Sequence, residues 1–328
     1  MTTMTMAKAL NVGLRRAMES DSRVLLFGED IGRLGGVFRI TDGLQKDFGE
    51  HRVMDAPLAE SGIVGTAVGL AMRGYRPVVE IQFDGFVYPA FDQIVSQVAK
   101  LHRRSEGMLA MPIVIRIPFG GGIGAVEHHS ESPEAYFAHT AGLRVLSPSD
   151  PQAAYLTIQQ AIACQDPVVY FEPKRRYWDK GDVDEAVDAL DPSQAPDPWR
   201  ARIVRRGSDV TVACYGPMVR TCLEAATASA DASIEVVDLQ SLSPLDIDTL
   251  AESVERTGRL VVVHEAAGSL GLGAEVAARI TERCFFALEA PVLRVTGYDV
   301  PYPPSRVEEH FLPGLDRVLD AVDRAMEY

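Results

Sequence analysis

The sequence predicts an α/β fold with two domains, and three observations support this prediction. The chain has 328 residues, enough for about two domains at roughly 150 residues each. Short β-branched runs alternate with helical patterns along the whole chain. These runs are apolar on both faces, which is typical of parallel sheets covered by helices. A proline-rich segment, residues 191–199, interrupts the alternation, so we expect the domain boundary near residue 190.

The first domain is expected to span residues 1–190 and the second residues 200–328. In the first, the patterns predict strands at 24–27, 78–83, 113–117, 144–146 and 168–171, and helices at 8–18, 61–72, 89–101 and 151–164. In the second, they predict strands at 210–215, 234–239, 260–264 and 292–295, and helices at 218–230, 247–256, 273–284 and 315–326. The segment between them, about 179–205, is acidic and then holds three prolines in seven residues, which predicts an exposed linker.

The composition excludes several classes of protein. Forty-six acidic against 32 basic residues give a net charge of −14, which disfavours nucleic acid and anionic membranes as partners. No apolar run reaches the roughly 20 residues of a membrane helix, and the N-terminus shows no secretory pattern. Four scattered cysteines are too few for a disulfide framework. We therefore expect a cytoplasmic protein with reduced cysteines.

Two glycine clusters follow predicted strands, where ligands bind in parallel sheets. The cluster in residues 28–36 has the spacing G-x-x-x-G-x-x-G, which differs from a dinucleotide fingerprint, and Glu29 and Asp30 would repel a pyrophosphate. The cluster Gly120–Gly124 is compatible with a phosphate cradle or with a flexible turn beside a site, and its sequence context favours the turn.

Glu60 is the one acidic residue in an otherwise small and apolar stretch, residues 56–72. A carboxylate beside a helix N-terminus, next to a Ser61 cap, would have a lowered pKa. Burial among apolar groups would raise the pKa instead and make Glu60 suitable for sharing a proton with a base. The composition leaves these two interpretations open.

Three of the seven histidines stand in informative sequence contexts. His128 and His129 are adjacent, so on an extended segment they point to opposite faces and do not readily bind one metal ion. His129 is a candidate for acid–base chemistry or substrate binding. We interpret His264 as structural, and Cys214 and Cys222 as core residues.

Longer motifs resemble a known family. The chain is similar to the beta subunit of the decarboxylating, thiamine diphosphate-dependent component of 2-oxoacid dehydrogenase complexes, of the branched-chain 2-oxoacid and pyruvate dehydrogenase type. The resemblance runs from about residue 5 to the C-terminus. It is carried by VLLFGEDIG (24–32), PLAESGIVG (57–65), EIQF (80–83), YPAFDQIV (88–95), HSESPEA (129–135), FEPK (171–174), VDL (237–239), SPLDID (243–248) and GRLVVVHEA (258–266).

The resemblance implies a transketolase-like pyrimidine-binding domain with a parallel sheet, followed by a smaller α/β C-terminal domain. It also implies an alpha subunit that carries the magnesium and diphosphate motif, beginning G-D-G; this chain contains no G-D-G. We therefore expect a chain that is active only in an α2β2 heterotetramer. A dihydrolipoyl acyltransferase core is the further expected partner.

The same resemblance assigns site residues. Glu60 is expected to hydrogen-bond the pyrimidine of thiamine diphosphate and favour the tautomer that takes the thiazolium proton. Phe86 is expected to stack on the ring, Leu58 and Gln82 to line its pocket, and His129 to contact the 2-oxoacid. A potassium site made of backbone carbonyls is also implied, at the positions Ile113, Ala161, Ile162, Cys164 and Asp166.

The expected function is decarboxylation of a 2-oxoacid and transfer of the acyl group to lipoamide. The sequences of residues 63–65 and 88–93 are closest to those of branched-chain members, with pyruvate or acetoin as the alternative substrate. The chain departs from the family at His129-Ser-Glu-Ser132, where an extra carboxylate bears on substrate choice. A non-catalytic assembly subunit is the alternative of another class, and a nucleotide-dependent dehydrogenase is disfavoured by the missing phosphate fingerprint.

Overall fold

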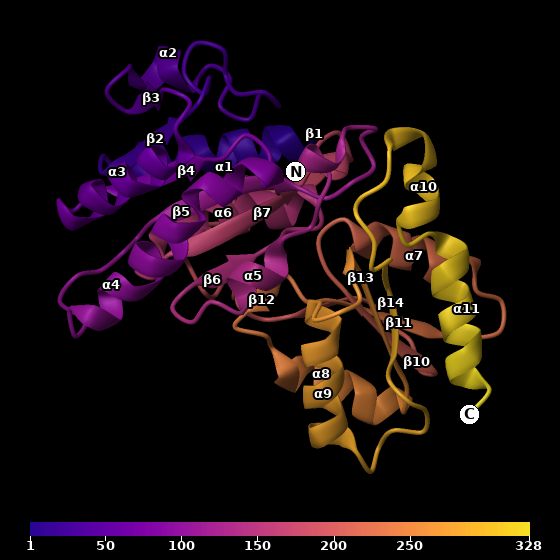
Figure 1. The fold of residues 1–328 in the computed structure, drawn as a ribbon. Coiled ribbons are helices and arrows are strands. Elements are labelled where there is room, and N and C mark those ends of the chain that lie inside the picture. Colours follow the sequence, from indigo (N-terminus) through magenta and orange to yellow (C-terminus); the bar gives the residue numbers. More distant parts are fainter.

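The computed structural model describes residues 1–328, which form two α/β lobes (Figure 1). The sheet of the first lobe has seven strands, six of them parallel. Its parallel strands are, in spatial order, β3 (Val53–Asp55), β2 (Val24–Gly28), β4 (Arg76–Glu80), β5 (Val114–Phe119), β7 (Val168–Pro173) and β6 (Arg144–Leu146). The seventh strand, β12 (Ser241–Ser243), comes from the second half of the chain and pairs antiparallel with β6.

Helices cover both faces of this sheet. Helices α1 (Met6–Ser20) and α6 (Pro151–Ala163) pack together on one face. The other elements of the lobe are α2 (Leu44–Phe48), α3 (Glu60–Met72), the 3₁₀ segment η1 (Asp84–Ala90), the π-helical segment η2 (Gln93–Val98), α4 (Ala99–Arg104), the 3₁₀ turn η3 (Glu127–His129), α5 (Glu134–Ala138) and the 3₁₀ turn η4 (Lys174–Arg176).

The second lobe has a five-stranded sheet. Its order is β14 (Leu293–Gly297), β13 (Leu260–Ala267), β10 (Val210–Cys214), β11 (Ile234–Asp238) and β9 (Arg202–Arg205), and only β9 runs antiparallel to its neighbour. The helices are α7 (Met218–Ala228), α8 (Ile247–Thr257), α9 (Leu272–Cys284), the 3₁₀ turn η5 (Ser305–Val307), α10 (Glu308–Phe311) and α11 (Leu315–Met326).

The central strands are apolar because they are covered on both faces. Every residue of β5, β7, β10 and β11 is buried, which explains why their sequences lack the alternation of a half-exposed strand. One core cluster of 35 residues includes side chains of both lobes, among them Phe119, Phe171, Tyr215 and Val262. The two domains are therefore packed on each other through a shared apolar core.

The nine predicted strands are all present, and the helices match closely with one exception. The helix expected at 89–101 is divided among η1, η2 and α4. Pro89 lies inside η1, and proline lacks the N–H that a regular helix requires. None of the helices combines the length and apolar character that crossing a bilayer would require.

The segment about 179–205 is exposed over much of its length, as its composition predicts, but it is anchored on the first domain. Residues Lys180–Val183 form strand β8, which pairs antiparallel with β1 (Thr2–Thr5). Val183, Ala189 and Ala195 are buried against Tyr155 and other residues of the first domain. A few apolar side chains thus anchor the segment to the first domain, while many of its other residues are exposed.

The glycine cluster Gly120–Gly124 is neither a phosphate cradle nor a free turn. The second domain binds its backbone: Gly121 N–H donates to Glu265 (3.3 Å), and the Gly122 and Gly124 N–H groups donate to Glu308 (2.8 and 3.1 Å). Carboxylates of the same chain thus occupy the donors that a phosphate would use. This contact also fixes the start of the loop that leads to His129.

Candidate active site

The candidate site lies along one edge of the first sheet. Strands β2, β4 and β5 are neighbours and parallel, so their carboxyl ends meet at the same edge. Glu29 follows β2, Gln82 follows β4, and the loop that carries His129 follows β5. In open parallel sheets this is the edge where ligands bind.

Glu60 is buried without a partner. It is the first residue of α3, whose N-cap is Ala59, and Ser61 makes no capping bond. The residue is only 6% exposed, and its carboxylate forms no hydrogen bond or ion pair within the chain. Glu60 therefore lies at a helix N-terminus and is also largely buried, so the structure combines the two settings that the sequence left open.

Glu29 is a second buried carboxylate beside Glu60. Burial, together with the nearby charge of Glu60, raises the pKa of Glu29. One of its oxygens, Oε1, is buried with no hydrogen-bond partner. From the sequence, Glu29 is considered only as a charge that would repel a nucleotide. The sequence signal that marks it as a site residue is its position directly after an apolar strand.

Gln82 connects the loops after β2 and β4. Its side-chain amide donates to the Glu29 carbonyl (3.4 Å) and to Asp30 Oδ2 (3.3 Å). Both hydrogen bonds are long, and they hold the Gln82 side chain near Glu29 and Asp30. The predicted residues Glu60 and Gln82 are thus brought to one place through Glu29.

An aromatic cluster holds the imidazole of His129. The ring stacks on Phe83 with centroids 4.0 Å apart and an interplanar angle of 16°, and Phe86 meets it edge-on at 5.2 Å. His129 Nδ1 is buried and has no hydrogen-bond partner. Phe83, which sequence reasoning did not select, therefore contacts His129 more closely than the predicted Phe86 does.

Leu58 does not line a closed pocket within this chain. It precedes α3 and is 81% exposed, which is high for a leucine beside a site. Other exposed apolar side chains of this domain outside its α-helices and strands include Leu34, Tyr88 of η1, Ile123 and Val126. Exposed apolar side chains around an incomplete site are typical of a surface that another subunit covers.

The residues present fit the pyrimidine half of thiamine diphosphate. Buried polar groups normally find partners, and here Glu29 Oε1 and His129 Nδ1 have none in the chain. Aromatic side chains lie beside them and can pack on a flat ring. The edge thus combines hydrogen-bonding groups without partners and apolar walls, as a bound heterocycle requires.

The predicted potassium positions lie at the opposite edge of the sheet, before β5 and β7. The Arg76 guanidinium occupies part of this place: its Nη1 donates to the carbonyls of Ile162 (2.9 Å) and Cys164 (3.2 Å). The Ile113 carbonyl accepts the Val168 N–H (2.9 Å). The carbonyls as arranged fit a guanidinium and do not fit an added cation, because the two positive charges would repel.

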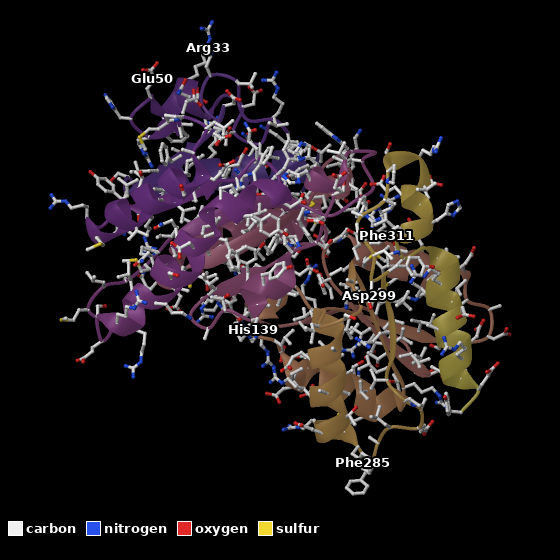
Figure 2. The ribbon with its side chains drawn as sticks, in the orientation of Figure 1. Arg33, Glu50, His139, Phe285, Asp299 and Phe311 are labelled. Carbon is white, nitrogen blue, oxygen red and sulfur yellow. The ribbon has the colours of Figure 1, made fainter.

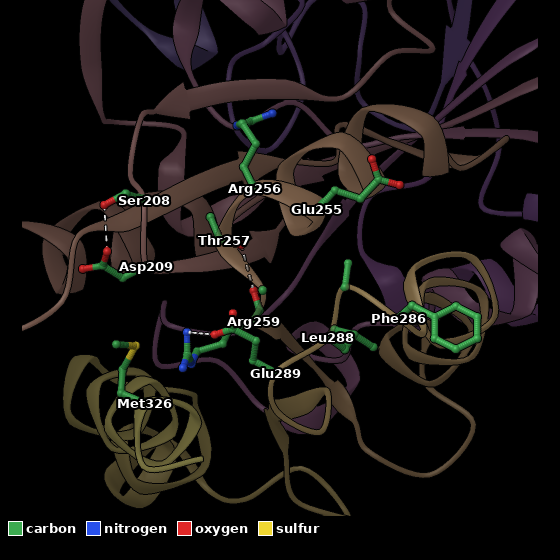
Figure 3. Close-up of a pocket in the computed structure, with 12 residues that line it drawn as sticks. Ser208, Asp209, Glu255, Arg256, Thr257, Arg259, Phe286, Leu288, Glu289 and Met326 are labelled. Carbon is green, nitrogen blue, oxygen red and sulfur yellow. Dashed lines mark hydrogen bonds and ion pairs between the residues drawn. The ribbon is translucent and has the colours of Figure 1, made fainter.

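Other features lie away from the candidate site. A surface pocket of about 440 Å³ in the second domain is lined by residues that precede β10 and β13, and is therefore at the amino edge of that sheet (Figure 3). Its Arg259 is paired with Glu289 at 2.6 Å. Phe285 projects from the tip of the second lobe, at the end of α9 (Figure 2). His264 is structural, as expected: its Nε2 accepts the Gly273 N–H, and burial lowers its pKa to about 4.

Fold and site define the class of protein. Residues 2–179 match the family described as the pyrimidine-binding domain of transketolase, and residues 200–318 match the transketolase C-terminal domain. A solved structure described as a split-gene transketolase, an inactive beta4 tetramer, superposes with a TM-score of 0.78. It is 22% identical and covers 99% of this chain and 98% of its own, so it supports the fold.

Closer relatives narrow the class to one family. A protein of Leifsonia xyli subsp. xyli named pyruvate dehydrogenase E1 component subunit beta is 57% identical, covering 99% of this chain and 96% of the relative. A Mycobacterium tuberculosis protein named 3-methyl-2-oxobutanoate dehydrogenase subunit beta is 55% identical, covering 99% and 92%. The chain belongs to the family of E1 beta subunits of 2-oxoacid dehydrogenases, which are transketolase-like, thiamine diphosphate-dependent enzymes.

Proposed function

We propose that this chain forms the pyrimidine half of a thiamine diphosphate site whose other half is supplied by an alpha subunit. The assembled enzyme decarboxylates a 2-oxoacid, with branched-chain 2-oxoacids preferred, and transfers the acyl group to lipoamide. The observation that carries the proposal is Glu60, a residue only 6% exposed that forms no hydrogen bond or ion pair within the chain and lies at the ligand-binding edge of the sheet.

The cofactor supplies a nucleophilic carbon and an electron sink for loss of carbon dioxide. Glu60 would hold a proton at a ring nitrogen of the pyrimidine, and Phe86 would fix the ring plane by stacking. Gln82 keeps the loop of Glu29 in place, and the apolar walls exclude water from these polar groups. His129, whose ring is held by Phe83, would meet the 2-oxoacid.

The alpha subunit would provide the magnesium and diphosphate contacts, because this chain contains no G-D-G motif. It would also cover Leu58 and the exposed apolar residues around the edge. An acyltransferase core is the next partner that we propose, since the charge of −14 suits a basic binding domain. A pull-down in low and in high salt tests this step; no binding in either would count against it.

The proposal also covers which 2-oxoacid the assembled enzyme prefers. The compared relatives carry both substrate names at nearly equal identity, 57% and 55%, so similarity alone does not separate them. Glu131, which stands in the loop of His129, adds a carboxylate whose Oε2 lies 3.5 Å from the Tyr88 hydroxyl. Competition between 3-methyl-2-oxobutanoate, pyruvate and acetoin in one assay measures the preference directly.

The experiment that tests the proposal is reconstitution with the alpha subunit. We expect the mixture to bind thiamine diphosphate and to decarboxylate a 2-oxoacid, while each chain alone does neither. Cofactor binding without turnover on any 2-oxoacid would favour a non-catalytic assembly subunit. Absence of cofactor binding by the mixture would contradict the proposal itself.

A further inference from the structure

A buried ion pair lies beside the loop that carries His129. Asp84, the first residue of η1, and Lys174, directly after β7, form an ion pair, and neither side chain is exposed to solvent. Removing two charges from water is costly, so such a pair by itself is weak evidence for a stabilising role. The bonds that it makes to its surroundings are therefore more informative than the pair itself.

Both members of the pair bind the backbone of the loop that carries His129. The ammonium of Lys174 donates to the His129 carbonyl at 2.6 Å, and Asp84 Oδ2 accepts the Glu131 N–H at 2.9 Å. The two bonds bracket Ser130, which is itself buried. The backbone on either side of this residue is thus fixed by charge-assisted hydrogen bonds, which are stronger than neutral ones.

The segment that provides Asp84 also provides the contacts to the imidazole. Phe83 stacks on the His129 ring and Phe86 meets its edge. Gly85 lies so close to the loop that a Cβ there would be 2.3 Å from the His128 carbonyl oxygen. Four consecutive residues therefore fix both the backbone and the ring of one histidine.

We propose that Asp84 and Lys174 are positioning residues that hold His129 in the orientation needed for the 2-oxoacid reaction. The inference rests on the proposed function, in which His129 meets the substrate. A hydrophobic residue in place of Lys174 would avoid the burial of a charge, but it would leave the His129 carbonyl and the Asp84 carboxylate without their donor. The pair thus acts on the reaction through the histidine.

The test is a double-mutant cycle in the reconstituted enzyme, with Lys174→Met and His129→Ala made singly and together. We expect Lys174→Met alone to lower kcat about 10- to 100-fold, because small displacements of a reacting group have effects of this size. Thiamine diphosphate affinity should stay within a few-fold of wild type. In the His129→Ala background, Lys174→Met should cause no further loss of kcat, because the group through which it acts is gone.

Two further variants keep the test decisive. Asp84→Asn retains an oxygen that can accept the Glu131 N–H but removes the charge, and it replaces Lys174→Met if that variant fails to assemble. Its loss of kcat should likewise vanish in the His129→Ala background. Lys100→Met is the matched control: Lys100 also donates to a carbonyl, that of Ala141 at 2.6 Å, but at an exposed position.

Two outcomes would overturn the inference, and they are distinguishable. If the kcat losses multiply in the double variant, the pair does not act through His129, while the proposed function stands. If His129→Ala alone keeps normal turnover, the assignment of His129 in the proposed function fails, and the positioning role fails with it.

Discussion

Two regions of the first sheet differ in how their buried polar groups are paired. In its interior, Arg116 of β5 binds Glu172 of β7 through Nε (2.6 Å) and Nη2 (2.8 Å), and Glu80 of β4 through Nη1 (2.6 Å). Tyr177 donates to Glu172 as well, at 2.6 Å. Burial disfavours the charged guanidinium, but Glu172 and Glu80 outweigh this effect and raise the pKa of Arg116.

At the carboxyl edge of that sheet, by contrast, Glu29 Oε1 and His129 Nδ1 are buried with no partner in the chain, and the nearby Glu60 forms no ion pair. Burial and the charge of Glu60 raise the pKa of Glu29, and no cation opposes them. The Arg116 network is satisfied within the chain, whereas the atoms left without partners at this edge lie where a ligand can complete them. The comparison therefore separates charges that stabilise the fold from charges that serve the site.

The largest expected effect is on turnover, at Glu60. Glu60→Gln should lower kcat of the reconstituted enzyme by about 10²-fold or more, because the proton held by the carboxylate is lost. Unfolding in urea should show no loss of stability in the isolated chain, since the substitution removes a charge that repels Glu29. Glu50→Gln, at an exposed position (Figure 2), is the control and should change neither quantity. Near-normal turnover of Glu60→Gln would refute the assignment.

Disrupting the interior network around Arg116 should lower the stability of the fold, in contrast to Glu60→Gln. Arg116→Met leaves Glu80 and Glu172 buried without a cation, so we expect a loss of about 3–5 kcal/mol in the free energy of unfolding. Arg324→Met removes an exposed pair with Asp320 and should cost less than about 1 kcal/mol. Equal losses in the two variants, measured by urea denaturation, would show that the interior pairing does not stabilise the fold.

A smaller, pH-dependent effect is expected at the domain interface. Burial raises the pKa of Glu134 to about 7, although the Tyr215 hydroxyl, 2.5 Å away, opposes this. Between pH 4.5 and 7 the folded chain keeps a proton that the unfolded chain has lost, so this contribution to stability falls as pH rises.

Glu134→Gln cannot ionise and keeps an acceptor for Tyr215. Its stability relative to wild type should therefore increase from pH 5 to pH 8, by an amount on the order of 3 kcal/mol. Urea unfolding at the two pH values measures this change. A constant difference between the variant and the wild type across this range would contradict the raised pKa.

The smallest effect is expected for potassium. Because Arg76 already donates to the carbonyls of Ile162, Ala163 and Cys164, replacing sodium by potassium at constant ionic strength should leave Tm unchanged. A rise of Tm that saturates with potassium would show that an ion binds there after all. In that case the guanidinium must move when the ion enters.

Local sequence patterns predicted the strands and helices well, because a strand that is buried on both faces consists of consecutive, mostly apolar residues. The runs 168–171 and 210–215 are almost entirely apolar and correspond to the central strands β7 and β10. Strand β12 was not predictable in this way, since Ser241–Ser243 is short and polar and pairs with a strand of the other domain. Buried small residues such as Ala189 likewise gave no signal within the acidic segment.

The site was predictable only in part. Glu60, Gln82 and His129 stand in recognisable motifs, and the order of the strands brings them to one edge. The pairing of Asp84 with Lys174 was not predictable, because 90 residues separate them and only the folded sheet brings them together. The partner surface around Leu58 also depends on a chain that this sequence does not encode.

The central claim is that Glu60 completes a cofactor site rather than stabilising a helix. A crystal structure of the reconstituted enzyme with bound thiamine diphosphate tests it most directly. We expect the Glu60 carboxylate to lie within hydrogen-bonding distance of a pyrimidine nitrogen, with no other partner. A cofactor ring bound elsewhere, or a Glu60 paired with a cation of the alpha subunit, would contradict it.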